Sequence, residues 1–347
     1  NGGLYSAEEG YFDIVIANPP YVVMPSNNPY WTYKTFSSLE LYAYFFEKGI
    51  TLLTKDGVIS YITASLYLKG MKFVNLRTFI ETYTKPISLK LVGDDVFENV
   101  KMPTAIFIAV NDANENEEWS FSDFNEEFKL LSKITEDTIL IKDVSTIMRG
   151  MEIGKDMAFE NGDIPFITGS NIQKYHIKTI SYITELTLKS FGKNPYYFSG
   201  ERILIRETGS KLTSIYVDFE LNSNRSLYSI KLKDSSFDYK FILACLNSRV
   251  LQFYYQTRFK SETNLFPKIR IGQVKELPIP NADKNKQQQV SELVDEILSS
   301  KKMDTNTSGI EAQIEILVYK LYNLTYDEVK VIDPEFQLSE VEYDSIK

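Results

Sequence analysis

The chain of 347 residues has one cysteine and one histidine, and each shortage excludes a class of site. The single Cys245 cannot form an internal disulfide or a multi-thiolate metal centre, and it fits the reducing cytoplasm. The single His176 excludes histidine-rich metal sites and argues against a hydrolytic triad. We therefore expect a cytoplasmic protein without a metal site.

Long apolar runs and a targeting segment are also missing from the sequence. The N-terminus lacks a basic region followed by an apolar stretch. The longest uncharged run, residues 14–33, contains four prolines, which a membrane helix does not tolerate. With 43% hydrophobic and 24% charged residues, the chain can bury sizeable cores, which argues against widespread disorder. We expect no membrane contact.

The net charge of −9 hides an uneven distribution of charge. Residues 168–275 contain 17 Lys and Arg against 8 Asp and Glu, a net charge of +9, whereas the rest contains 21 against 39, or −18. A basic segment between acidic flanks is a weak indication of a polyanionic partner. A solvated basic face is the commoner explanation.

Strand and helix patterns alternate in the first part of the chain. Four segments have the pattern of strands: residues 12–17, 58–63, 87–92 and 104–110. The first of them reads as a short buried strand. Apolar spacing predicts helices over residues 39–53 and 74–83. The alternation predicts an α/β fold with a parallel, doubly wound sheet.

From about residue 140 the pattern changes to short apolar runs broken by Gly, Asn and Ser, which predict a second, β-rich domain. A helix is expected over residues 239–255. Two amphipathic helices follow residue 282, and Thr325 with Glu328 predicts a capping box for a final short helix. We therefore expect three parts, with boundaries near residues 138 and 281.

The tetrapeptide Asn18-Pro19-Pro20-Tyr21 directly follows the first predicted strand. Ligands of open α/β sheets bind at the carboxyl ends of strands, so the position suits a site. The prolines fix their own φ angles and bias the preceding residues towards extended backbone, which holds the Asn18 side chain and nearby carbonyls in place. The Asn18 amide oxygen and the Pro19 carbonyl can together accept both N–H bonds of one exocyclic amino group.

This arrangement suits methyl transfer to a planar aromatic amine. Accepting both hydrogens favours a pyramidal nitrogen whose lone pair points at an electrophilic methyl group, and the acceptors stabilise the developing positive charge. The ring of Tyr21 supplies a flat face for stacking on the base. A base inside a duplex reaches such a site only by flipping. An ordinary turn at the end of a strand is the alternative interpretation.

With these residues, the sequence resembles the adenine-N6 DNA methyltransferases of restriction-modification systems. The likeness continues over LELYAYFFEKGITLLTKDGVISYIT, and over VNLRTFI followed by VGDDVF. In that last segment the resemblance assigns Phe97 to the flank of the flipped base, and a plain core phenylalanine is the alternative. Ala64 stands where the family often has proline, which is expected to change only the shape of a loop.

The resemblance implies S-adenosylmethionine as the cofactor, but the main motif that binds it is missing. The family's glycine-rich loop and the acidic residue that holds the ribose normally precede the catalytic loop. Here 17 residues precede Asn18, and Gly2, Gly3 and Gly10 do not form the motif. The chain looks like the C-terminal part of a longer enzyme. We expect that it alone neither binds the cofactor tightly nor turns over, and micromolar binding of S-adenosylmethionine in titration calorimetry would refute this.

Residues 141–322 resemble the target-recognition domain and helical tail of fused restriction-methylation enzymes. The matching stretches are DVSTIMRG, PFITGSNIQKY, LACLNSRVLQFYY, FPKIRIGQVKELPIP and IEILVYKLYNLT. The likeness implies double-stranded DNA as the partner. Contacts to DNA are expected from some members of a basic set: Arg202, Arg206, Lys211, Arg225, Arg258, Lys260, Lys268 and Arg270. For each of them, a solvated surface charge is the alternative.

Residues and resemblance together predict part of a site-specific DNA adenine-N6 methyltransferase within a type II restriction-modification enzyme. Residues 1–138 are expected to form the C-terminal part of a Rossmann-like catalytic domain, residues 139–281 a mixed α+β target-recognition domain, and residues 282–347 a helical tail. Two alternatives stay open: a DNA-recognition module without catalysis, and an amino-methyltransferase of protein or RNA. Glu207 with Lys211 lacks the strand context of a nuclease site and is discarded.

Overall fold

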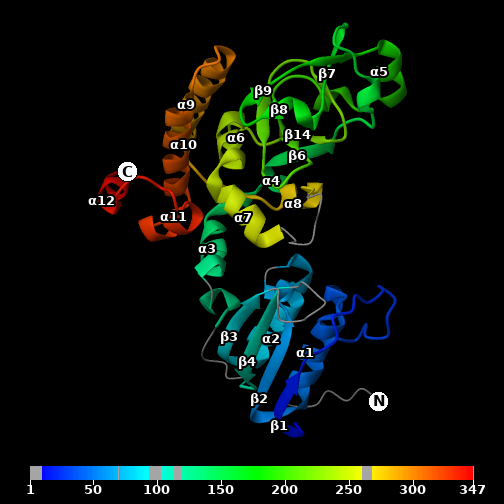
Figure 1. Cartoon of the computed structure of the whole chain (residues 1–347), viewed down its shortest axis with the longest axis vertical. Helices are drawn as coiled ribbons and strands as arrows, with labels where there is room; N and C mark the ends of the chain where they lie inside the picture. Colours follow the sequence, from blue (N-terminus) through cyan, green and yellow to red (C-terminus); the bar gives the residue numbers. More distant parts are fainter. Residues whose placement is uncertain are drawn as a thin grey trace. The chain divides into compact units, whose positions relative to one another are not determined.

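A computed structural model describes residues 10–68, 70–93, 103–112, 119–124, 126–259 and 268–346. The chain divides into two compact units, residues 1–129 and 130–347, which Figure 1 colours from blue to red along the sequence. Within the described ranges, no helix is both long and apolar enough to cross a membrane. No group of three or more His, Cys, Asp or Glu side chains suited to a metal ion occurs in those ranges either.

The first unit contains a four-stranded sheet in the order β1-β2-β4-β3. Its strands are β1 (Phe12–Ala17), β2 (Leu53–Ala64), β3 (Lys85–Gly93) and β4 (Thr104–Val110). β1 is parallel to β2, whereas β4 is antiparallel to both β2 and β3. Consequently β1, β2 and β3 run in one direction, and β4 runs against them.

The wholly parallel sheet predicted from the sequence is therefore wrong for β4. Residues 94–103 connect β3 to β4, and this connection is shorter than the dozen or so residues that a parallel crossover needs. The longer connections contain α1 (Leu41–Leu52), between β1 and β2, and α2 (Val74–Tyr83), between β2 and β3. The unit is accordingly a mixed α/β structure.

The two helices of the first unit pack against each other and build an aromatic core. On α1, Phe46 is fully buried, and its ring centroid lies 5.0 Å from that of Tyr61 in β2 and 6.2 Å from that of Phe107 in β4. Aromatic side chains of this size bury much apolar area each. The core thereby fixes the sheet against the helices.

β1 is an edge strand whose apolar side chains are largely exposed. β2 pairs with one side of β1, and no other described strand pairs with it. Phe12, Ile14 and Ile16 are 52%, 61% and 74% exposed. The prediction of a buried strand is thus correct in its bounds and wrong in its burial, because β-branched composition indicates a strand without showing what covers its faces.

The second unit is rich in β-structure, as the short apolar runs predict. Its main sheet is antiparallel, in the order β12-β11-β14-β6, and a smaller sheet has the order β10-β7-β13. The strands are β6 (Ser145–Arg149), β7 (Ile164–Ile167), β10 (Ser181–Ile183), β11 (Arg202–Arg206), β12 (Ser214–Val217), β13 (Asn222–Ser223) and β14 (Leu227–Leu232). One buried cluster containing Ile167, Leu204 and Leu227 joins the two sheets.

The helix expected over residues 239–255 is two helices, α6 (Tyr239–Asn247) and α7 (Arg249–Phe259). Ser248 between them is extended, and its Oγ accepts a hydrogen bond from the backbone N–H of Leu251 at 3.2 Å. A serine in this position ends one helix and caps the next. α6 packs on β11 and β12, so the main sheet is covered on that side.

The C-terminal helices pack on the second unit. They are α9 (Lys284–Lys302), α10 (Ser308–Leu321), α11 (Tyr326–Ile332) and α12 (Glu340–Ser345). α9 and α10 lie side by side (Figure 1) and α9 contacts α6. The capping box predicted for Thr325 and Glu328 is present at the start of α11 and is confirmed. The tail and the β-rich part therefore form one compact unit, and their division into two domains stays a prediction.

Shorter elements complete the second unit. They are α3 (Glu126–Ile134), which spans the boundary between the units, β5 (Thr138–Leu140), α4 (Ile141–Val144), β8 (Ile172–Gln173), β9 (His176–Ile177), α5 (Glu185–Phe191), α8 (Ile271–Lys275) and β15 (Pro278–Pro280). β15 pairs with β5, and the hydroxyl of Tyr322 donates to the carbonyl of Pro278 at 2.8 Å. The domain boundary expected near residue 281 therefore comes directly after β15, which is held in a small two-stranded sheet.

Candidate functional site

Asn18-Pro19-Pro20-Tyr21 begins where β1 ends. Ala17, the last residue of β1, pairs with Tyr61 of the parallel strand β2, so the tetrapeptide lies at the carboxyl edge of this pair of strands. Pro19 is buried, whereas Asn18 is exposed. A buried proline beside an exposed amide suits ligand contact at the end of a strand, because the backbone is fixed while the side chain stays accessible.

Tyr21 also holds the amide of Asn18. Its hydroxyl donates to Asn18 Oδ1 at 2.9 Å and lies 3.2 Å from the carbonyl oxygen of Ile62 in β2. Its ring meets that of Tyr42 edge to face, with centroids 6.2 Å apart. Burial raises the pKa of the Tyr21 hydroxyl, so it remains a donor at neutral pH. The sequence assigned Tyr21 only a stacking role, and this hydrogen bond adds a second one.

Two predicted site residues, Phe97 and Lys260, lie outside the described residues. The roles expected for them stay predictions.

Gly10, the one glycine of the expected cofactor region that the structure describes, does not lie in an open loop. Gly10 is packed against the start of β2, since a Cβ on it would lie 1.8 Å from the carbonyl oxygen of Leu53. Gly10 is therefore not part of an open loop that could cradle a cofactor. Gly2 and Gly3 lie outside the described residues. The expectation that the chain alone does not bind the cofactor tightly stays a prediction.

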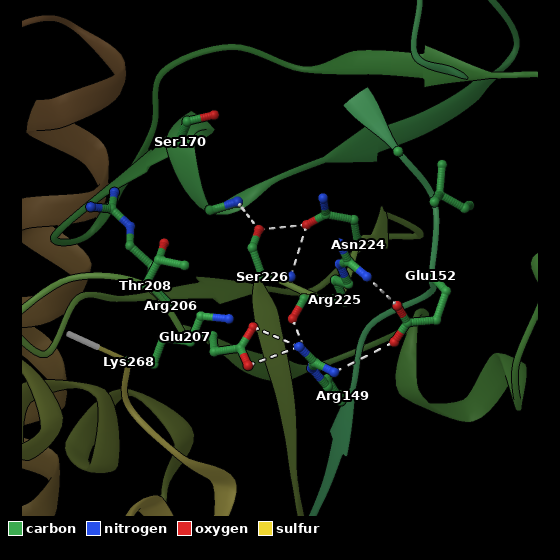
Figure 2. A pocket seen from close by; sticks show the side chains of 13 residues that line it. Arg149, Glu152, Ser170, Arg206, Glu207, Thr208, Asn224, Arg225, Ser226 and Lys268 are labelled. Atoms are coloured by element: carbon green, nitrogen blue, oxygen red, sulfur yellow. Dashed lines mark hydrogen bonds and ion pairs between the residues drawn. The ribbon is translucent and has the colours of Figure 1, made fainter. Parts of the chain in front are cut away.

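The second unit contains a polar pocket with a volume of about 800 Å³ (Figure 2). Its lining comes from five separate parts of the chain: Arg149 with residues 152–154, residues 169–170, 206–208 and 224–226, and Lys268. The main sheet supplies Arg149 at the end of β6 and Arg206 at the end of β11. Strand ends and loops therefore assemble the pocket from positions far apart in the sequence.

A buried carboxylate anchors one wall of the pocket. Glu207 is 8% exposed, and both of its oxygens accept hydrogen bonds from Arg149 Nη2, at 2.8 and 2.9 Å. The hydroxyl of Tyr228 also donates to Glu207, at 3.3 Å. Hydrogen bonding to Glu207 raises the pKa of the Arg149 guanidinium. Hydrogen bonds between a guanidinium and a carboxylate are assisted by charge and are stronger than bonds between neutral groups.

The wall continues outward through a second ion pair. Glu152 accepts from Arg225 Nη1 at 3.0 Å and lies 3.5 Å from Arg149 Nη1. Glu207, Arg149, Glu152 and Arg225 thus form an alternating series of charges, hereafter the charge row, whose hydrogen bonds and ion pairs are drawn as dashed lines in Figure 2. It begins at a buried carboxylate and ends at a guanidinium whose side chain is 64% exposed.

The pocket brings together three of the basic residues predicted to contact DNA: Arg206, Arg225 and Lys268. Lys211 and Arg270 are exposed but do not line it. Arg258 is half-buried, with its guanidinium 5.9 Å from the ring centroids of both Tyr254 and Phe259. The predicted set therefore divides into pocket residues and scattered surface or packed residues.

The structure corrects the prediction for Arg202. This side chain is fully buried, and its guanidinium donates to the carbonyl oxygens of Gly200, Phe219 and Leu221 at 2.6, 2.8 and 2.9 Å. Burial lowers its pKa to about 10. A guanidinium committed to three carbonyls inside the fold cannot also reach DNA, so the role of Arg202 is to satisfy buried acceptors.

Sequence reasoning missed the inner part of the charge row. Arg149 and Glu152 lie outside the basic segment of residues 168–275, so the charge count does not include them. The sequence offers Glu207 only as a carboxylate of a nuclease site, an interpretation that is discarded. A signal was available in Arg149 and Glu152, two opposite charges close together after a strand-like run. Cys245 is buried in α6, and burial raises the pKa of its thiol.

Two family models match parts of the chain. Residues 4–97 match the Eco57I restriction-modification methylase, and residues 164–279 match the TaqI-like C-terminal specificity domain. A protein of Methanocaldococcus jannaschii, assigned as a type II restriction enzyme and methyltransferase, is 25% identical over 377 residues. That match covers 91% of this chain and 31% of the relative, so the chain spans about a third of the relative's length.

Solved structures of restriction enzymes are also similar to the chain. The type IIL restriction-modification enzyme MmeI in complex with DNA is 10% identical, with a TM-score of 0.49 over 96% of this chain and 56% of its own. The type IIG restriction endonuclease BpuSI is 14% identical, with a TM-score of 0.36 over 90% and 54%. These scores are too low to carry an argument about the chain. The family matches confirm the likeness expected from the sequence: residues 4–97 are similar to the Eco57I restriction-modification methylase, and residues 164–279 are similar to the TaqI-like C-terminal specificity domain.

Proposed function

We propose that the chain is the part of a site-specific DNA methyltransferase that holds the target base and recognises the DNA sequence. The target atom in this proposal is N6 of adenine, and the methyl donor is S-adenosylmethionine. The observation that carries the proposal is the exposed Asn18 amide beside a buried Pro19 at the carboxyl end of β1. The methylase match over residues 4–97 supports the same reaction class.

The arrangement of acceptors suits an exocyclic amine. After accepting from Tyr21, Asn18 Oδ1 still has a lone pair for one N–H of the target, and the Pro19 carbonyl can accept the other. Both acceptors then stabilise the positive charge that develops on the nitrogen during attack. The proton can leave after the transfer, so the chemistry needs no strong general base. The scarcity of histidine in the chain is therefore no obstacle.

Recognition of DNA is proposed for the second unit. The specificity-domain match and the basic side chains of the pocket support this assignment. Holding the amine of a base at Asn18 requires that base to leave the stack, so base flipping forms part of the proposal.

A DNA-recognition module without catalysis is the second candidate. The close packing of Gly10 against the start of β2, which places this glycine outside an open cofactor loop, favours it. The two candidates share the partner and differ only in whether a methyl group is transferred.

The decisive experiment uses the full-length protein that contains this chain. It is incubated with methyl-labelled S-adenosylmethionine and duplex DNA, and the nucleosides are then separated by mass. We expect N6-methyldeoxyadenosine, and far less label in the same time with the Asn18→Ala variant, although that variant still retains DNA. Label on cytosine, protein or RNA would contradict the adenine assignment, and DNA retention without any label from the unaltered protein would favour the second candidate.

A further inference from the structure

The pocket of the second unit contains two kinds of cation. Arg149 and Arg225 are both paired with carboxylates in the charge row. Arg206 donates instead to the carbonyl oxygen of Ile172, and Lys268 has no carboxylate within ion-pair distance among the described residues. The charges of Arg149 and Arg225 are therefore compensated by glutamates. Among the described residues, no carboxylate compensates the charges of Arg206 and Lys268, which can therefore attract an anion.

We propose that Arg225 recognises a guanine in the major groove and that the rest of the charge row positions it. This inference rests on the proposed recognition of DNA by the second unit. Glu152 occupies only Nη1 of Arg225, which leaves the Nε and Nη2 edge without a partner in the part of the chain that the structure describes. Two parallel donors on one edge match the O6 and N7 acceptors of guanine.

Charge compensation favours a base edge over a phosphate as the ligand of Arg225. The charge row contains two arginines and two glutamates, so its formal charge sums to zero. A phosphate approaching Arg225 would also meet the carboxylate of Glu152, which repels it. Arg225 can still form directional hydrogen bonds, and hydrogen bonds to base edges are what discriminate between bases. Lys268, which has no carboxylate partner among the residues that the structure describes, is assigned to the DNA backbone.

The contacts of Arg149 explain how an exposed arginine is held. Arg149 Nε donates to the backbone carbonyl of Arg225 at 3.1 Å, and Arg149 Nη1 faces Glu152, which in turn holds the Arg225 guanidinium. One guanidinium therefore fixes both the backbone and the head group of Arg225. Buried Glu207 fixes Arg149 with both oxygens. Such preorganisation reduces the side-chain entropy lost when Arg225 binds.

The test selects duplexes from a random-sequence library with the chain and compares the enriched motif between variants. With Arg225→Lys, we expect the preference for guanine at one position to fall about tenfold or more, because the charge is kept and the paired donors are lost. The dependence of affinity on salt should not change. Glu152→Gln should weaken the same position without weakening affinity for unselected DNA, because the head group of Arg225 is released and no positive charge is lost.

Lys268→Ala is the matched contrast within the pocket. It should lower affinity for all duplexes alike and reduce the salt slope by about one, with the motif unchanged. Lys189→Ala, at an exposed lysine of α5 outside the pocket, should change neither quantity. All four variants alter exposed or half-exposed side chains, so melting curves should match that of the unaltered chain.

The possible failures are distinguishable. If the unaltered chain enriches no duplex, recognition of DNA by this unit fails, and the assignment of Arg225 fails with it. If it enriches a motif that Arg225→Lys leaves intact, only the assignment of Arg225 is overturned. A uniform loss of affinity with Arg225→Ala, accompanied by a lower salt slope, would mean that Arg225 contacts phosphate and would also overturn it.

Discussion

The two candidate sites differ in how the chain builds them. Asn18-Pro19-Pro20-Tyr21 is continuous, and two prolines and one hydrogen bond within it fix its shape. The pocket of the second unit draws on five segments between Arg149 and Lys268, held together by two sheets and a buried carboxylate. A continuous site can lose one side chain and keep its backbone, whereas an assembled site depends on the packing that brings its segments together.

The strands that carry the two sites differ in the same way. β1 is an edge strand with exposed apolar side chains, while β11, which supplies Arg206 to the pocket, lies inside its sheet and is almost fully buried. Substitutions in the tetrapeptide should therefore change chemistry with little effect on folding. Substitutions under the pocket should change folding first and recognition only as a consequence.

The largest expected effect is that of Asn18→Ala. Removing one of two acceptors for the target amine should lower the rate of methyl transfer by the full-length protein about 100- to 1000-fold. DNA binding and thermal stability should be unchanged, because Asn18 is exposed and belongs to the other unit than the pocket. Single-turnover rates and gel retardation measure the two quantities. An equal loss of DNA binding would show that Asn18 acts in recognition and would break the contrast between the sites.

Arg202→Met should have the next largest effect. It should lower the free energy of unfolding, and not the rate of methyl transfer directly. Three buried carbonyls lose their donor, which is expected to cost about 2 to 4 kcal/mol in the free energy of unfolding. Denaturant unfolding of the chain measures this cost. Lys211→Met, at an exposed position of the same unit, is the control and should cost little. If Arg202→Met weakens DNA binding while unfolding is unchanged, the correction made for Arg202 is itself wrong.

The pattern of neighbouring residues predicted the bounds of several helices and strands correctly, but it did not predict which parts of the fold pack beside them. The bounds of β1, α2 and β4 agree with the sequence patterns, because strand and helix periodicity is a property of neighbouring residues. The exposure of β1 and the direction of β4 depend on which strands lie beside them. Neighbouring residues carry no such information.

The same limit applies to the sites. The tetrapeptide could be recognised because its donors and acceptors are adjacent in the sequence. Arg202 and Arg206 are both basic residues of one strand, yet the first points into the core and the second lines the pocket. Glu207 gains its meaning only from Arg149, 58 residues earlier. A count of charges along the sequence cannot distinguish a buried arginine from one that lines the pocket, because the difference lies in how deeply the fold buries each side chain.

Tyr21→Phe tests the hydrogen bond that the structure adds to the continuous site. The ring and its stacking face remain, but Asn18 Oδ1 loses the donor at 2.9 Å that orients it. One hydrogen bond contributes about 0.5 to 1.5 kcal/mol, so the rate of methyl transfer should fall roughly two- to tenfold. Rates at saturating DNA measure this. An unchanged rate would mean that the prolines alone orient the amide.

Pro20→Ala should have the smallest effect and shows how far the tetrapeptide depends on its prolines. Pro20 is exposed, so the substitution leaves no cavity, while φ at this position and the extended bias on Pro19 are relaxed. The added freedom of the unfolded chain should cost about 0.4 to 1 kcal/mol of stability. The rate should fall less than with Tyr21→Phe, because the Asn18 amide and the Pro19 carbonyl both remain. Denaturant unfolding and single-turnover rates provide the two measurements.

A loss of rate as large as that of Asn18→Ala would mean that the ring of Pro20 sets the position of both acceptors. The shape of this site would then depend on one side chain as strongly as the pocket depends on Glu207.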